Sequence, residues 1–137
     1  MRKKIASFYN EELNSWIDAI NYIFIEIAEL EKRLEDIVSR NSIVDIAAKV
    51  EVHQLILNKS KGKYISLKDE LLKQKAMLIV NKKLLADNMV TKEIEKSMRD
   101  YSLKIKQLEK QFIDVKYICN EFLSDMLKKY TMSNKSN

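Results

Sequence analysis

The chain has 137 residues, with no proline, one glycine (Gly62), one cysteine (Cys119) and a formal net charge of +5. Because the turns of β-rich domains are built mostly from Gly, Pro, Asn and Asp, this composition excludes a β-rich fold, and a lone cysteine excludes an internal disulfide. The mild positive charge is common in proteins and is weak support for a nucleic-acid or membrane partner. We therefore expect an all-α protein.

The first residues carry the basic groups of a signal peptide but not its apolar segment. Polar side chains at Asn10, Glu11 and Glu12 interrupt the sequence too early for such a segment. The richest apolar stretch, residues 20–28, contains Asn21 and Glu26, and it is far shorter than the ~20 residues that a membrane-spanning helix needs. We expect a cytoplasmic protein without a transmembrane segment.

A first long helix is predicted over residues 9–39. Apolar residues recur there at alternating steps of three and four, the repeat of helices packed side by side along their length. The two lines are Leu13, Ile20, Ile27 and Leu34, and Trp16, Ile23, Leu30 and Ile37. The polar run at residues 39–42 predicts the first connection.

A second helix is predicted over residues 43–87. An apolar residue occurs at every seventh position: Ile43, Val50, Leu57, Tyr64, Leu71, Leu78 and Leu85. Gly62 lies inside this segment and leaves two alternatives, one continuous helix or two shorter ones. We favour the continuous helix because the repeat passes through Gly62 unbroken, and a glycine inside a helix costs only about 1 kcal/mol relative to alanine.

A third helix is predicted over residues 91–130, with Asn88 or Thr91 as its N-cap. Its repeat runs through Ile94, Met98, Tyr101, Ile105, Leu108, Phe112, Val115, Cys119, Phe122 and Met126. The polar residues 131–137 are predicted to form a disordered tail.

Three long helices with short connections predict an elongated antiparallel three-helix bundle, a single domain over residues 1–130. At 1.5 Å per residue, the second helix is expected to be about 68 Å long and the first about 45 Å, which leaves an arm of the second and third helices uncovered. Either the N-terminal segment around Ile5 and Phe8 reaches further than expected, or another chain covers the arm. We predict a homodimer or a helical partner that binds these residues: Leu71, Leu72, Leu78, Ile79 and Leu85.

Nothing in the sequence resembles a reaction centre. His53 is the only histidine and is predicted to pack near Leu30 and Phe122. Carboxylate-bridged metal sites in helical bundles use two Glu-x-x-His pairs, and Glu51 lies at the wrong spacing from His53. Cys119 falls on an apolar line, where a cysteine is buried and inert. We predict no enzyme activity, no metal and no cofactor.

The clearest charge pattern is a row of lysines at seven-residue spacing in the second predicted helix: Lys61, Lys68, Lys75 and Lys82. A basic strip of this kind binds repeated phosphates with strong salt dependence. More commonly, such lysines flank a helix–helix seam and pair with carboxylates of the neighbouring helix. Binding of nucleic acid or an anionic surface is therefore the alternative function.

Three segments resemble a family of short, all-helical, coiled-coil proteins of Bacteroidetes-type bacteria. They are residues 16–40, which begin at Trp16, the run Val50-Glu51-Val52-His53-Gln54, and residues 112–127. The resemblance implies the helical fold and no activity, since the family has none assigned. The sequence thus predicts a non-enzymatic helical interaction or scaffold module that associates with itself or with a partner through residues 71–100.

Overall fold

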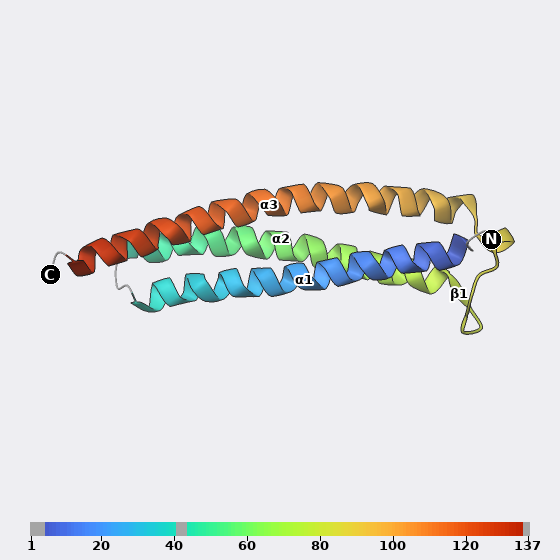
Figure 1. Cartoon of the computed structure of the whole chain (residues 1–137), viewed down its shortest axis with the longest axis horizontal. Helices are drawn as coiled ribbons and strands as arrows, with labels where there is room; N and C mark the ends of the chain where they lie inside the picture. The colour runs from blue at the N-terminus through green and yellow to red at the C-terminus, as the bar shows by residue number, and fades with distance from the viewer. Residues whose placement is uncertain (1–4, 41–43, 136–137) are drawn as a thin grey trace. The chain divides into compact units, whose positions relative to one another are not determined.

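The structure, a computed structural model, describes residues 5–40 and 44–135. Within these ranges it contains three long helices, α1 (Ile5–Arg40), α2 (Val44–Met77) and α3 (Lys92–Lys135). Two short strands, β1 (Ile79–Val80) and β2 (Lys83–Leu84), and the 3-10 turn η1 (Asp87–Met89) lie between α2 and α3 (Figure 1). The fold is the all-α three-helix bundle that the composition and the apolar repeats predict.

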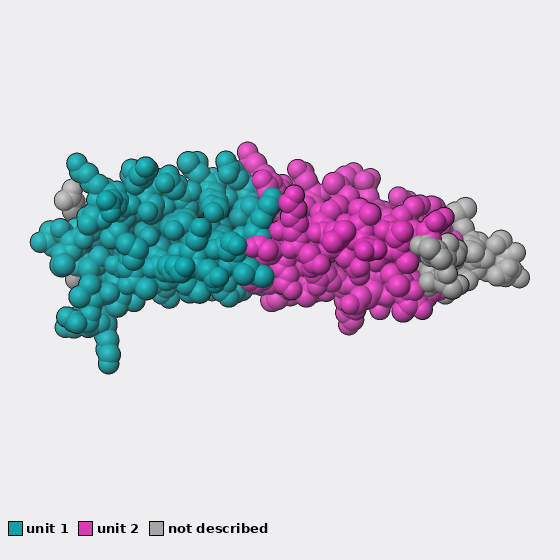
Figure 2. All heavy atoms as spheres, turned by 180° about the vertical axis from the view of Figure 1, so that it is seen from behind, with its two compact units in different colours: residues 1–23, 63–109 teal, residues 24–62, 110–137 magenta. Residues whose placement is uncertain are grey.

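The contacts between helices group the chain into two compact units, where the sequence predicts one domain (Figure 2). Unit 1 comprises residues 1–23 and 63–109, and unit 2 comprises residues 24–62 and 110–137. Each unit therefore contains one part of every helix. Within each unit the α2 segment runs antiparallel to the α1 and α3 segments (Figure 1).

The seven-residue lines form the cores of both units. Unit 1 buries Leu13, Ile20, Tyr64, Leu67, Leu71, Leu78, Ile94, Met98 and Ile105, and unit 2 buries Ile27, Leu34, Val50, Leu57, Phe112 and Cys119. The second line of α1 is less enclosed, because Trp16, Ile23 and Ile37 are only half-buried. The repeat thus identified the core, and the line of Leu13, Ile20, Ile27 and Leu34 is the deeper of the two in α1.

Helix α2 passes through Gly62 without interruption, which confirms the continuous helix over the two shorter ones. A Cβ atom built on Gly62 meets nothing within 4 Å. No close approach or unusual backbone angle therefore requires glycine at this position.

The predicted end of the second helix is wrong: α2 ends at Met77, not at residue 87. The chain instead forms an antiparallel hairpin in which Ile79 lies opposite Leu84 and Val80 opposite Lys83. The two turn residues, Asn81 and Lys82, have φ angles of 51° and 65°. Positive φ at both central residues is the requirement of a type I′ turn, which matches the twist of the flanking strands.

The seven-residue repeat concealed this hairpin. Leu78 and Leu85 are both buried, as the repeat predicts, but the N–H of Leu85 donates to the carbonyl of Leu78 at 2.8 Å. The two leucines are neighbours across a hairpin and not two turns apart on a helix. The spacing therefore predicted their burial correctly and their backbone incorrectly.

Helix α1 begins at Ile5, four residues before the predicted start at residue 9. The backbone N–H of Ile5 donates a hydrogen bond to Oδ1 of Asp87 in η1 at 2.8 Å. With 36 residues in α1 and 34 in α2, the two helices are about 54 and 51 Å long. Of the two alternatives for the arm, the longer reach of the N-terminal segment is therefore correct. The predicted uncovered arm does not form, and the original reason for a homodimer is lost with it.

Helix α3 begins as predicted after Thr91, whose Oγ1 accepts the N–H of Ile94 at 3.2 Å. This N-cap satisfies one of the free donors in the first turn of the helix. The helix extends to Lys135, so the predicted disordered tail from residue 131 is wrong as far as residue 135. Residues 136–137, and residues 41–42 of the first predicted connection, lie outside the described ranges.

Candidate interaction surfaces

The five residues predicted to bind a partner divide into two groups. Leu71, Leu78 and Leu85 are buried in the core of unit 1, so they are not available to a partner. Leu72 and Ile79 are exposed. The prediction is therefore wrong for three of the five residues, because it assumed that α1 leaves this part of α2 uncovered.

An exposed apolar surface nevertheless lies on the hairpin. Ile79, Val80 and Leu84 are 42%, 50% and 40% exposed, and Met77 at the end of α2 is also exposed. We call these four residues the hairpin surface. The hairpin projects from the end of α2, as the ribbon and the space-filling view both show (Figures 1 and 2). Ile79 and Leu84 lie opposite each other and therefore share one face of the hairpin, and contiguous exposed apolar side chains are characteristic of interaction sites.

The backbone of the hairpin adds polar groups to this surface. The hydrogen bond from Leu85 to Leu78 makes these two residues a hydrogen-bonded pair of the antiparallel ladder. Because such pairs alternate with non-hydrogen-bonded ones, the N–H and C=O groups of Ile79 and Leu84 point outwards, away from the opposite strand. Within the described ranges, no residue outside the hairpin forms a hydrogen bond with Ile79 or Leu84.

The lysines of the predicted basic strip do not share one helix. Lys61, Lys68 and Lys75 are half-buried on α2, whereas Lys82 is exposed in the hairpin turn. Lys68 Nζ donates to Oδ1 of Asn21 in α1 at 2.7 Å. An interhelical contact of this kind is expected for a lysine that flanks a helix–helix seam. Binding of nucleic acid or an anionic surface through the strip stays a prediction.

Interhelical ion pairs occur in both units. In unit 1, Lys104 of α3 reaches Glu70 of α2 at 3.1 Å, and in unit 2, Lys116 of α3 reaches Glu26 of α1 at 2.6 Å. The exposed pair between Lys104 and Glu70 contributes roughly 0–1 kcal/mol. In the other pair the Glu26 side chain is only 18% exposed.

His53 packs as predicted beside Phe122, with the two rings stacked at a centroid distance of 4.4 Å. Burial lowers the pKa of His53 below its ordinary value. Burial likewise raises the pKa of Cys119, which opposes formation of the reactive thiolate, and nearby Arg33 offsets this only in part. In residues 5–40 and 44–135, no three His, Cys, Asp or Glu side chains are grouped in a way that suits a metal ion.

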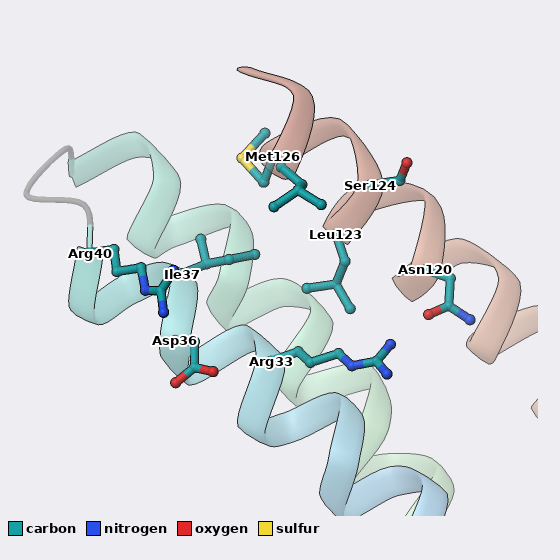
Figure 3. Close-up of a pocket in the computed structure, with 9 residues that line it drawn as sticks. Arg33, Asp36, Ile37, Arg40, Asn120, Leu123, Ser124 and Met126 are labelled. Atoms are coloured by element: carbon teal, nitrogen blue, oxygen red, sulfur yellow. The ribbon is translucent and has the colours of Figure 1, made fainter. Parts of the chain in front are cut away.

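Unit 2 contains a groove of about 450 Å³ between the last turns of α1 and the C-terminal part of α3 (Figure 3). Its apolar lining comes from Ile37 on α1 and Leu123, Met126 and Leu127 on α3. The polar lining residues are Arg33, Asp36, Arg40, Asn120 and Ser124. Sequence reasoning missed this groove, since no motif marks it and its residues are ordinary members of two amphipathic helices.

Comparison with protein families, with characterised proteins and with solved structures gives no match to this chain. The resemblance to a coiled-coil family of Bacteroidetes-type bacteria therefore stays a prediction. Over the part of the chain that the structure describes, none of the helices has an apolar stretch long enough to span a bilayer.

Proposed function

We propose that the protein is a non-enzymatic interaction module that associates with a second copy of itself through strand β1. The observation that carries the proposal is the outward-facing N–H and C=O of Ile79, which lie beside exposed apolar side chains on a projecting hairpin. An unpaired strand edge is a ready template for strand addition, in which backbone hydrogen bonds supply affinity.

Of the two edges, β1 is the one that suits association. Its residues, Ile79 and Val80, are both β-branched and apolar. Strand β2 carries Lys83 and is preceded by Lys82, and lysine on an edge strand discourages pairing with another chain. Only the β1 edge is therefore suited to pairing with another chain. Because each copy has one such edge, two copies form a closed dimer and not an open-ended stack.

A second copy fits this edge because an antiparallel strand pair is self-complementary. With the two-fold axis at Ile79, each Ile79 N–H donates to the Ile79 carbonyl of the other copy, and the same patch is used on both sides. The axis also places the two Ile79 side chains about 5 Å apart, where β-branched pairs stabilise a sheet. The lysines of each copy then lie on the strand away from the contact.

Sedimentation velocity at tens of micromolar tests the proposal. The wild-type protein should sediment as a dimer, and Ile79→Pro should be monomeric because it removes the outward N–H without removing a bond of the Leu78–Leu85 ladder. Ile79→Lys, which keeps that N–H but places like charges at the axis, should also be monomeric. Leu103→Ser, at a residue of α3 that is 61% exposed, should leave the dimer unchanged.

A wild-type protein that is monomeric at these concentrations would refute the proposal. So would an Ile79→Pro variant that remains dimeric. A dimer that Leu103→Ser disrupts as strongly as Ile79→Pro would assign the contact to the helices instead. Circular dichroism of each variant verifies that the helices are retained.

A further inference from the structure

We propose that the groove of unit 2 binds a small anionic amphiphile, a molecule with one carboxylate on an aliphatic body. The site is independent of the hairpin surface, which belongs to unit 1. It rests on the combination of an apolar lining with two arginines, Arg33 and Arg40, that line the same groove.

The aliphatic body is accommodated by the lining from both helices. Figure 3 shows Ile37 and Leu123 on opposite sides of the groove, with Met126 beside them. A volume of about 450 Å³ lies in the range of roughly 300–1,000 Å³ that is typical of small-molecule sites. Such sites combine a mainly apolar lining with a few polar groups that fix the orientation of the ligand.

The carboxylate has two candidate partners, Arg33 and Arg40, which line the groove two turns apart on α1 and hold their guanidinium groups at separate places in it (Figure 3). Among the described residues, neither guanidinium forms an ion pair within 4 Å. The only carboxylate in the lining is Asp36, so the groove keeps a net positive charge. Guanidinium groups bind carboxylates through two parallel hydrogen bonds, which makes arginine the residue suited to this anion.

A small molecule suits the groove better than a docked helix. The lining residues span 33–40 on α1 and 120–127 on α3, a length of about 10 Å on each helix. A helix of about 12 residues, near the minimum for a stable isolated helix, is about 18 Å long. A helical partner would therefore extend beyond the lining on both sides.

The test is a titration of the isotope-labelled full chain with octanoate, followed by nuclear magnetic resonance into the millimolar range. Saturable shifts are expected at Ile37, Leu123 and Met126. Octanol and octyltrimethylammonium share the aliphatic chain but lack the anion, and acetate has the anion without the chain. Octanol and octyltrimethylammonium should bind about tenfold or more weakly, because a hydrogen bond to a charged group is worth roughly that factor. Acetate should also bind about tenfold or more weakly, because it lacks the aliphatic chain whose burial favours binding.

Variants separate binding from a purely structural role. The double variant Arg33→Gln/Arg40→Gln should weaken octanoate binding about tenfold, whereas Arg99→Gln, an exposed arginine of unit 1, should leave it unchanged. A basic residue in the last turn, such as Arg40, also stabilises a helix C-terminus. A double variant that melts earlier but binds octanoate as before would overturn the proposal. So would equal binding of octanoate and octyltrimethylammonium, or no saturation at all.

Discussion

Replacement of Gly62 by alanine should stabilise the protein by about 1 kcal/mol. Gly62 lies inside the continuous helix α2, and an added Cβ meets no atom within 4 Å. Alanine therefore gains the full difference in helix propensity, roughly 0.8–1.0 kcal/mol, without a steric penalty. With an unfolding entropy of about 2.1 cal/mol/K per residue, a chain of 137 residues has about 0.29 kcal/mol/K, so 1 kcal/mol corresponds to a rise in Tm of about 3–4 °C.

Thermal unfolding followed by far-ultraviolet circular dichroism, which reports the helix content of the protein, measures this shift in Tm. The matched control is Ala48→Gly, an exposed alanine of the same helix, which should lower Tm by a similar amount. If Gly62→Ala leaves Tm unchanged or lowers it while the control behaves as expected, the backbone at Gly62 is not that of a helix interior. The alternative of two shorter helices would then be correct.

Two further predictions concern the hairpin and His53. Lys82→Gly should stabilise the hairpin by about 1 kcal/mol, because Lys82 has a φ of 65°, which glycine adopts without penalty. Hydrogen exchange of the Leu85 N–H, which is bonded across the hairpin, should then become slower. Faster exchange would contradict the type I′ turn. Burial lowers the pKa of His53 in the folded state, so its contribution to stability is fully present above the unfolded value of about 6.5 and is lost as the pH falls through the folded pKa. Urea unfolding between about pH 7 and pH 5 should show this loss of stability in the wild-type protein. The variant His53→Phe keeps an aromatic ring against Phe122 and should lose less stability over the same range. Equal pH dependence in the two proteins would exclude His53 as the cause.

The sequence predicts the helical core well because burial follows the seven-residue repeat directly. Leu13, Leu57 and Ile105 are buried where the repeat places them, and the N-cap at Thr91 follows from its hydroxyl and position. The end of α2 was not predicted, because Leu78 and Leu85 satisfy the same repeat in a hairpin. The available signal was Asn81, a residue that tolerates positive φ, between the strand-forming pair Ile79-Val80 and Leu84.

The surfaces were harder to predict than the core. Burial of Leu78 depends on how far α1 extends, and the first residue of α1, Ile5, contacts Asp87, a residue 82 positions away that no local pattern connects with it. The groove depends on the space between α1 and α3 near Ile37 and Leu123, which no local pattern in either helix specifies. Local periodicity determines which side of a helix is apolar, but not how completely its neighbours cover that side.

The hydrogen bond between Ile5 and Asp87 also bears on the order of folding. Residues 63–109 of unit 1 are contiguous, so the end of α2, the hairpin and the start of α3 come together through short loops with little loss of chain entropy. The α1 segment of the same unit must close a loop that spans most of the chain. We therefore expect this segment of α1 to dock late. During synthesis, its apolar line at Leu13 and Ile20 emerges before the α2 and α3 segments that cover it, which exposes this stretch to aggregation and to chaperone binding in the meantime.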